Sequence, residues 1–301
     1  MQQSDRAGLL FALAGFCCLS VGDAVVKGMA DEWPATAIAA LRYVMGAIGL
    51  SAILLAREGM APFRTIPKPG IQWLRGLGVA VATVCFFTGV WLMPLADAAS
   101  ITFMQPMLTA VLAAAFLGER LRTTAVIATI VAFGGVLIVL RPNFLAIGPA
   151  ALLPLVAAFG MAILMTANRA ARGSGSALAM QAYIACFAAP LLVGFAVVGH
   201  VSGVEEFAVD WPEWHVIARC AFVAVSASLA HGLVYMGTER AGAATVAPMT
   251  YGQLLVAITL GWLFFDEVPD LVTLLGAAII IGSGLWLWRD GRNRRPEDVA
   301  R

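Results

Sequence analysis

Ten long apolar runs divide the chain, and they constrain its fold more than any other feature. A helix that spans a bilayer needs about 20 mostly apolar residues. The runs of this kind are Ala7–Val26, Pro34–Ala56, Ile71–Trp91, Ala96–Leu117, Thr123–Leu140, Ala150–Ala171, Ala177–Gly199, Trp214–Gly237, Ala241–Phe265 and Val268–Trp288. Only 12% of the residues are charged, whereas roughly a quarter are charged in a water-soluble domain. We therefore predict an all-α membrane protein with ten transmembrane helices.

The stretch Ala96–Arg122 recurs in the second half of the chain. Its small-residue opening matches the sequence that starts at Ala241, and Glu119 corresponds to Glu267. A glycine-rich segment follows each glutamate at the same offset. A repeat at fixed spacing indicates two related structural units. We predict repeats over residues 7–141 and 148–289, each with five helices, and a cytoplasmic tail over residues 290–301.

The distribution of basic residues predicts the orientation in the membrane. Basic residues near short loops favour the cytoplasmic face. If the N-terminus is cytoplasmic, the external side keeps only Lys27 and Arg141 as basic residues, so we expect both termini in the cytoplasm. Because each half has an odd number of helices, the second half is inverted relative to the first. Inverted repeats of this kind place a substrate site near the middle of the bilayer.

Two five-helix units with a small-residue opening, an embedded proline, a Gly-Glu or Asp-Glu exit and a glycine-rich last helix resemble a known family. They are similar to the EamA-type branch of the drug/metabolite transporter superfamily, over about Ala7 to Arg289. Within it, the chain most resembles bacterial amino-acid exporters of the YddG type. The resemblance implies that the first, third, fourth, sixth, eighth and ninth helices line a central cavity. We expect a monomer in the bacterial inner membrane, without a cofactor or a nucleic-acid partner.

Polar, aromatic and methionine residues recur at helical spacing on those six helices. A polar side chain that faces lipid is costly, so these residues should face protein or a wet cavity. The candidate substrate-binding residues are Ser20, Thr88, Trp91, Thr102, Gln105, Thr109, Met161, Met165, Asn168, Ser228, His231, Tyr235, Tyr251 and Gln253. Structural roles stay open for several of them, because membrane-helix hydroxyls often bond to their own backbone, methionine packs cores and tryptophan anchors at the membrane surface.

Charged residues inside or beside the helices form a second group of candidates. Asp23 and Lys27 are one turn apart on the first helix, so we predict a gating or counter-ion pair. Arg42 lies well inside the second helix and could bind an anion or pair within the bundle. Glu119 and Glu267 lie at matched helix ends, where a carboxylate can accept from the free N–H groups that begin the following helix.

The sequence contains no nucleophile, metal-ligand or phosphate-loop pattern, so we do not predict an enzyme or a metal site. The middle of the first helix, Gly15–Cys18, has no acid, which disfavours proton-coupled exchange of lipophilic cations. An apolar cavity with neutral hydrogen-bonding groups suits amino acids. We predict export of amino acids and related small metabolites by alternating access and facilitated diffusion. The alternatives are proton-coupled efflux of cationic drugs, with Asp23 as counter-ion, and a non-transporting membrane scaffold.

Overall fold

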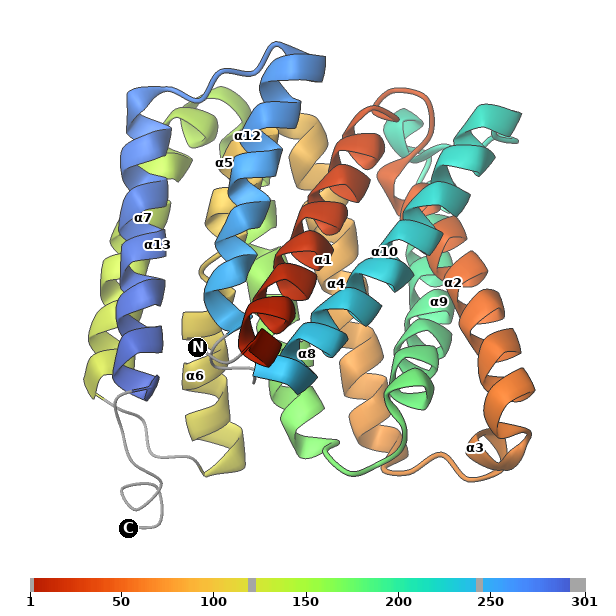
Figure 1. Cartoon of the computed structure of the whole chain (residues 1–301). Helices are drawn as coiled ribbons and strands as arrows, with labels where there is room; N and C mark the ends of the chain where they lie inside the picture. The colour runs from red at the N-terminus through yellow and green to blue at the C-terminus, as the bar shows by residue number, and fades with distance from the viewer. Residues whose placement is uncertain (1–2, 119–122, 242–245, 293–301) are drawn as a thin grey trace. The chain divides into compact units, whose positions relative to one another are not determined.

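The computed structural model describes residues 3–118, 123–241 and 246–292, which are mostly helical and contain no strand (Figure 1). The elements are α1 (Gln3–Lys27), α2 (Ala35–Glu58), α3 (Ala61–Arg64), α4 (Pro69–Leu92), α5 (Leu95–Thr102), α6 (Gln105–Leu117), α7 (Thr123–Ile147), η1 (Gly148–Leu152), α8 (Leu153–Ala170), α9 (Ala177–Val201), η2 (Glu205–Phe207), α10 (Trp214–Ala241), η3 (Ala247–Tyr251), α12 (Gly252–Phe265) and α13 (Leu271–Arg292).

The apolar helices match the predicted runs closely. Within the described ranges, nine helices are long and apolar enough to cross a membrane, and a shorter apolar helix covers Met249–Phe265. The predicted run from Ala241 to Phe265 includes residues 242–245, which lie outside those ranges. The predicted all-α class is confirmed, and the length and composition of the apolar helices are consistent with a membrane protein.

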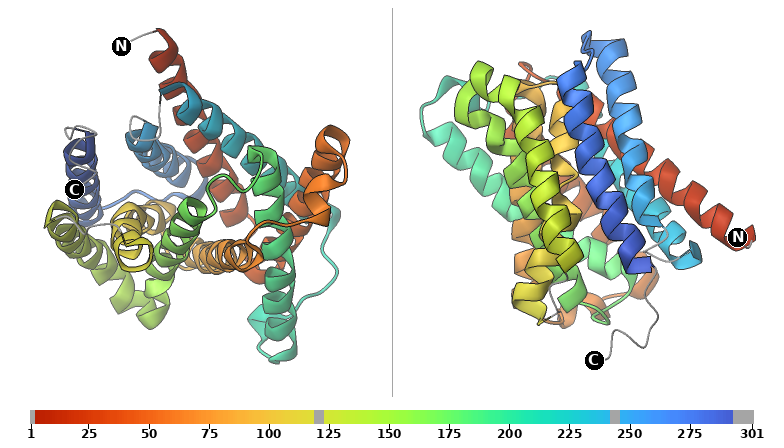
Figure 2. Two further views of the ribbon diagram at one scale, coloured as in Figure 1. Left: turned by 90° about the horizontal axis from the view of Figure 1, so that it is seen from below. Right: turned by 90° about the vertical axis from the view of Figure 1, so that its left-hand side faces the viewer.

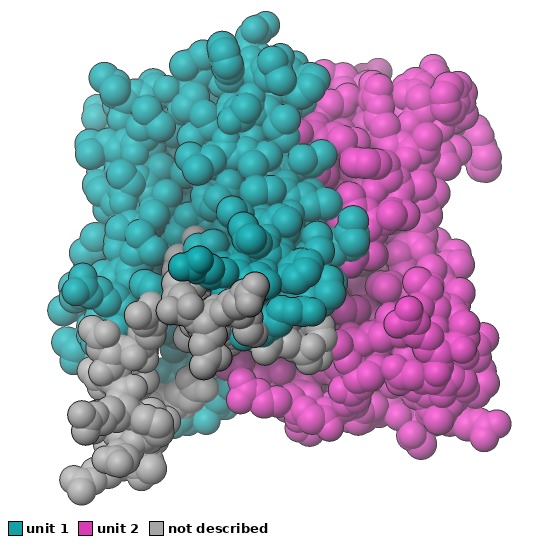
Figure 3. All heavy atoms as spheres, in the orientation of Figure 1, with its two compact units in different colours: residues 1–21, 93–148, 229–301 teal, residues 22–92, 149–228 magenta. Residues whose placement is uncertain are grey.

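The chain divides into two compact units, shown in different colours in Figure 3. Unit 1 consists of Met1–Val21, Met93–Gly148 and Leu229–Arg301, and unit 2 consists of Gly22–Leu92 and Pro149–Ser228. Each unit takes segments from both predicted repeats, because helices that are distant in sequence pack together. The repeat boundaries at residues 7–141 and 148–289 stay a prediction.

In unit 1, α7 packs along α13, and α5 packs against α12. The pair α7 and α13 can be followed in Figure 1 and in the right-hand view of Figure 2. Two glycines permit this contact. A Cβ atom on Gly135 would lie 2.9 Å from the carbonyl oxygen of Gly276, and one on Gly276 would lie 2.8 Å from that of Gly135. Small residues let helix backbones approach closely in membrane proteins.

Glycine residues also permit close contact between helices in unit 2. Here α4 packs against α8 and α9, and α2 packs against α9. A Cβ atom on Gly78 of α4 would lie 2.8 Å from the carbonyl oxygen of Gly160 on α8, and the reverse distance is 2.7 Å. Buried side chains of α2, α4, α9 and α10 complete the core, among them Ile38, Phe87 and Leu192. The core of each unit therefore combines glycine contacts between backbones with apolar packing.

Two of the predicted runs are interrupted near a proline. The run Ala96–Leu117 forms two helices, because α5 ends at Thr102 and α6 begins at Gln105 with Pro106 in its first turn. Pro106 has no N–H, so the carbonyl of Thr102 loses its normal helical donor. In the second copy, the 3₁₀ helix η3 precedes α12 and has Pro248 in its first turn.

The matched exits of the two copies share one backbone conformation. Gly118 ends α6 with φ 69°, and Asp266 ends α12 with φ 54°. Glycine adopts this left-handed conformation freely, and aspartate adopts it more readily than most residues. The Gly-Glu and Asp-Glu signatures therefore mark helix ends that require a positive φ.

Candidate functional site

The two helix interruptions of unit 1 meet each other. Phe103, the C-cap residue that follows α5, and Tyr251, the last residue of η3, pack edge to face with ring centroids 5.4 Å apart. The Tyr251 hydroxyl lies against Gly284 of α13, where a Cβ atom would overlap it. The methyl group of Met107 would lie 3.4 Å from the same Cβ atom. Irregular backbone from two distant parts of the chain thus meets beside α13, and we call this place the paired break.

Several predicted residues lie around the paired break. The buried Ser20 hydroxyl donates to the carbonyl oxygen of Gln253 at 3.1 Å, which joins α1 to α12. The Thr102 hydroxyl donates to Ala99 at 2.7 Å. Thr109 donates to the carbonyl of Gln105 at 2.8 Å. These hydroxyl groups can still accept a hydrogen bond, because each keeps oxygen lone pairs.

The remaining predicted residues of unit 1 are less constrained. The side chain of Gln105 is half-buried, as is that of Gln253, whereas His231 is exposed. Tyr235 belongs to α10, but its side chain lies outside the described part of the chain. Glu119 also lies outside it.

In unit 2, Asn168 binds a buried arginine. Its Oδ1 atom accepts from Arg75 Nε at 2.6 Å, and Arg75 also donates to the side chain of Gln72 and to the carbonyl of Met180 at 3.1 Å. The Arg75 side chain is 2% exposed. Asn168 Nδ2 in turn contacts the sulfur of Met165 at 3.9 Å. Asn168 therefore helps to hold α4 against α8 and α9.

The other predicted residues of unit 2 also make contacts within the protein. Met161 and Met165 pack at the edge of its hydrophobic core. The Ser228 hydroxyl donates to the carbonyl of Ala224 at 2.8 Å. Thr88 and Asp23 are half-buried. These contacts are consistent with the structural roles that the sequence left open for the two methionines and for Ser228.

The ends of α1 and α4 are tied by two reciprocal hydrogen bonds. The Lys27 ammonium group donates to the carbonyl of Val90 at 2.6 Å, and the indole N–H of Trp91 donates to the carbonyl of Val26 at 3.1 Å. Trp91 and Lys27 therefore fix one end of unit 2, beside the loop that follows α1.

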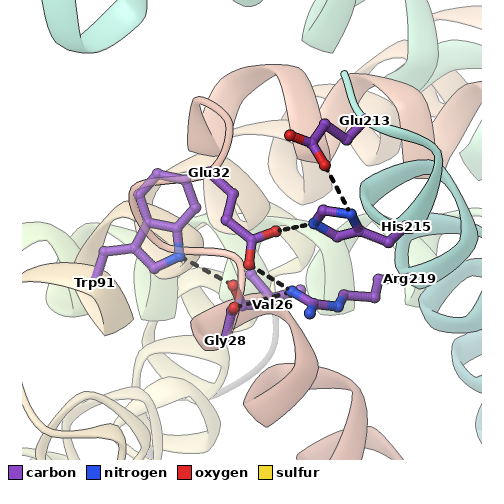
Figure 4. Close-up of polar contacts among 7 residues, drawn as sticks. All are labelled: Val26, Gly28, Glu32, Trp91, Glu213, His215 and Arg219. Carbon is purple, nitrogen blue, oxygen red and sulfur yellow. Dashed lines mark hydrogen bonds and ion pairs between the residues drawn. The ribbon is translucent and has the colours of Figure 1, made fainter.

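That loop carries an ionic cluster which the sequence did not reveal (Figure 4). The Glu32 carboxylate accepts from Arg219 Nη1 at 2.8 Å and lies 2.9 Å from His215 Nε2. His215 Nδ1 lies 3.2 Å from Glu213, and Arg219 also donates to the carbonyl of Gly28 at 3.2 Å. We call these residues the loop cluster.

The loop cluster predicts a pH dependence. Partial burial by itself raises the pKa of Glu32, but hydrogen bonds from Arg219 and His215 outweigh burial and hold this pKa below its usual value. A lowered carboxyl pKa stabilises the fold at pH values above the unfolded pKa of about 4.3, and the contribution disappears as the pH falls through the folded pKa. Because the cluster is partly exposed, Glu32→Gln should cost at most about 1 kcal/mol at pH 7.

The measurement is the thermal midpoint of both proteins in detergent between pH 7 and pH 3.5. The difference between the two midpoints should persist down to about pH 5 and should shrink below about pH 4. Glu206→Gln, in the exposed helix η2, serves as the matched control and should show no difference. A gap that widens below about pH 4 contradicts the role given to Glu32.

Glu267 caps a helix, but not the one that follows it. Its carboxylate accepts from the backbone N–H of Leu95 at 2.9 Å, at the start of α5. Pro94 precedes that helix and offers no side-chain acceptor. The following helix, α13, is instead capped by Asp270, which accepts from the N–H of Thr273 at 2.7 Å. The bond to Leu95 could not be predicted, because the sequence alone does not show which helix N-terminus lies near Glu267.

Glu267→Ala should destabilise the protein by about 1–2 kcal/mol, since loss of an N-cap acceptor typically costs that much. Glu267→Gln keeps a side-chain oxygen and should recover most of the loss. Thermal midpoints of the two variants provide the measurement, with a decrease of roughly 2–4 °C per kcal/mol. Equal midpoints for alanine and glutamine would show that the bond to Leu95 contributes nothing.

The model of the EamA-like transporter family matches residues 6–141 and, a second time, residues 148–289. The two matches cover nearly the whole chain. This chain belongs to that family. Membership identifies the molecule as a membrane transporter of the drug/metabolite transporter superfamily, and it favours a non-enzymatic role.

Relatives of this EamA-like transporter carry chemically different small molecules. The chain is 26% identical to an S-adenosylmethionine uptake transporter of Rickettsia bellii, over 93% of this chain and 92% of the relative. It is 26% identical to the pseudopaline exporter CntI of Pseudomonas aeruginosa, over 94% and 96% of the two chains. It is 28% identical to a riboflavin transporter of Rhizobium johnstonii, over 80% and 78%.

The fold of this EamA-like transporter also resembles a solved crystal structure. The similarity has a TM-score of 0.60 and covers 95% of this chain and 98% of the other, at 18% identity. At this level of identity the similarity concerns the fold alone. Together with the family match, it supports one shared helical architecture.

Proposed function

We propose that this EamA-like transporter exports amino acids and related small amphoteric metabolites by alternating access. The observation that carries the proposal is the paired break, where Phe103 contacts Tyr251. In many transporters, interrupted helices bind the substrate with backbone groups that have lost their helical partners. The freed carbonyl of Thr102 suits a substrate ammonium group. The Tyr251 hydroxyl and the amides of Gln105 and Gln253 suit a substrate carboxylate.

The relatives support a small polar substrate, but they do not agree on the direction of transport across the membrane. One relative is named for uptake and another for export. S-adenosylmethionine contains an amino-acid moiety, which agrees with the substrate class proposed here. Export rests on the resemblance to amino-acid exporters and on the name of the Pseudomonas relative.

Three features support an inverted-repeat transport mechanism. Helices at matching positions of the two halves pack together, namely α2 with α9, α5 with α12 and α7 with α13. The matched ends of α6 and α12 share a positive φ. The family model matches each half once. A twofold axis in the membrane plane accounts for all three, and the basic residues support cytoplasmic termini in a bacterial inner membrane.

Counterflow in liposomes tests the proposal. Vesicles that contain the purified protein are loaded with unlabelled phenylalanine, methionine or threonine and diluted into the labelled amino acid. We expect saturable accumulation without a pH gradient, and none in protein-free vesicles. Flux of S-adenosylmethionine or riboflavin alone would overturn the amino-acid assignment. Failure of every solute would contradict transport of this substrate class.

Proton-coupled transport is the second candidate, and Asp97 is the observation that favours it. This carboxylate is 4% exposed at the start of α5 and accepts from Asn143 Nδ2 at 2.7 Å. A buried acid in a membrane helix is a frequent proton carrier. If a pH gradient drives the flux and Asp97→Asn removes that dependence, coupled transport replaces facilitated diffusion.

A further inference from the structure

Arg42 lies inside a membrane-spanning helix. It is the eighth residue of α2, so it lies about 10 Å from the start of the helix at ~1.5 Å per residue. The helix as a whole is a candidate membrane span. A charge at this depth is costly unless it pairs with another group or lines a wet cavity. Its surroundings therefore decide what Arg42 can do.

The flat faces of the guanidinium are near aromatic rings. Arg42 Cζ lies 5.0 Å from the ring centroid of Tyr43 and 5.3 Å from that of Phe87 on α4. Phe87 is 2% exposed, and the Tyr43 hydroxyl accepts from Thr83 at 3.3 Å, so both rings are held in place. Cation–π contacts stabilise the charge and orient its plane. They do not use the N–H groups at its edge.

Those N–H groups have no protein acceptor within the described ranges, since no hydrogen bond or ion pair of Arg42 occurs there. The side-chain nitrogens of Arg42 are not fully buried, so they keep some solvent-accessible surface. Two other arginines of unit 2 differ. Arg75 is surrounded by Gln72, Asn168 and the Met180 carbonyl, and Arg219 is paired with Glu32. Among these three arginines, only Arg42 makes no hydrogen bond or ion pair with the protein within the described ranges.

We propose that Arg42 is an anion-binding subsite that takes the carboxylate of a small organic molecule. The planar guanidinium fork matches a carboxylate in two parallel hydrogen bonds. The neighbouring rings of Tyr43 and Phe87 favour a carboxylate carried on an apolar or aromatic body. That the anion belongs to a transported metabolite rests on the proposed function. The binding of a carboxylate by Arg42 does not depend on that function.

Ligand-induced thermal stabilisation of the purified full chain tests the subsite without transport. The probes share one body and differ in one group: 3-phenylpropionate, 2-phenylethylamine and 3-phenylpropanol. We expect only the carboxylate to raise the thermal midpoint saturably. Arg42→Gln should weaken its apparent affinity at least tenfold, and Arg42→Lys should weaken it less. Arg219→Gln, at an arginine already paired with Glu32, is the matched control and should bind as the wild type does.

A second measurement needs no variant and covers the case in which Arg42→Gln does not fold. Phenylglyoxal modifies arginine, and mass spectrometry gives the rate at Arg42 in the wild-type protein. We expect 3-phenylpropionate to slow this reaction several-fold, and 2-phenylethylamine to leave it unchanged. An unchanged rate with all three probes overturns the subsite.

The two proposals fail in different ways. Equal stabilisation of the wild type and Arg42→Gln by 3-phenylpropionate overturns the subsite, as does stabilisation by phosphatidylglycerol but not by the carboxylate probe. Absent counterflow with intact, Arg42-dependent carboxylate binding refutes the proposed function and leaves the subsite standing. Normal amino-acid counterflow without carboxylate binding supports the proposed function and refutes the subsite.

Discussion

Gly135→Leu is expected to lower the thermal midpoint of the purified protein by roughly 5–10 °C, or to prevent its folding. A Cβ atom at this position would lie 2.9 Å from the Gly276 carbonyl oxygen and 2.8 Å from an Ile280 side-chain carbon. The backbone carbonyl cannot move without displacing α13. The separation of α7 and α13 must therefore grow along the whole contact, which removes packing on both helices. Size-exclusion chromatography and a thermal melt in detergent provide the measurement.

The neighbouring glycine provides a matched control. Gly134 is also on α7, but a Cβ atom there would meet nothing within 4 Å. Gly134→Leu should therefore change the free energy of unfolding by no more than about 1 kcal/mol, since leucine is the better helix former. If both substitutions act alike, helix propensity or lipid contact governs the effect, and the close α7–α13 contact does not.

Gly284→Ala is expected to reduce the kcat/KM of amino-acid counterflow about tenfold or more while the protein stays folded. The added methyl group would overlap the Tyr251 hydroxyl, so the ring must leave its contact with Phe103. A tenfold loss corresponds to about 1.4 kcal/mol of lost interaction with the substrate in transit. Initial rates of counterflow over a range of phenylalanine concentrations provide the measurement.

A double substitution separates this effect from general damage. Tyr251→Phe removes the overlapping oxygen and leaves the added carbon about at the limit of contact, 3.0 Å from the ring carbon Cζ. The pair Gly284→Ala with Tyr251→Phe should therefore recover part of the rate, which is a coupling that independent sites do not show. Gly282→Ala, where the added carbon meets nothing within 4 Å, should transport normally. Strict additivity of the two losses would contradict the paired break.

The helices could be predicted from sequence because length and apolar content are local properties. Each of the ten apolar runs has a helical counterpart, and Pro106 lies in the first turn of α6, directly after the break. The contacts between helices could not be predicted in the same way. Gly134 and Gly135 are adjacent in sequence, yet only Gly135 faces α13, because successive residues point about 100° apart around a helix.

The site was predictable only in part, for a similar reason. Polar spacing on single helices selected Ser20, Tyr251 and Gln253, which lie near one another in unit 1. The same spacing selected Asn168, whose amide is occupied by the buried Arg75. The loop cluster was missed because Glu32 bonds to residues 183 and 187 positions away. No local pattern marks such a pair.

Cysteine accessibility at Thr102 tests most directly whether the paired break binds substrate. The background replaces Cys17, Cys18, Cys85, Cys186 and Cys220, and Thr102→Cys is labelled in membrane vesicles with a charged, water-soluble thiosulfonate. Ile130→Cys, at a 67% exposed apolar position of α7, is the matched control and should not react from water. The account predicts that Thr102→Cys reacts and that saturating phenylalanine slows the reaction several-fold. An unreactive cysteine, or one labelled at the same rate with and without phenylalanine, would contradict it.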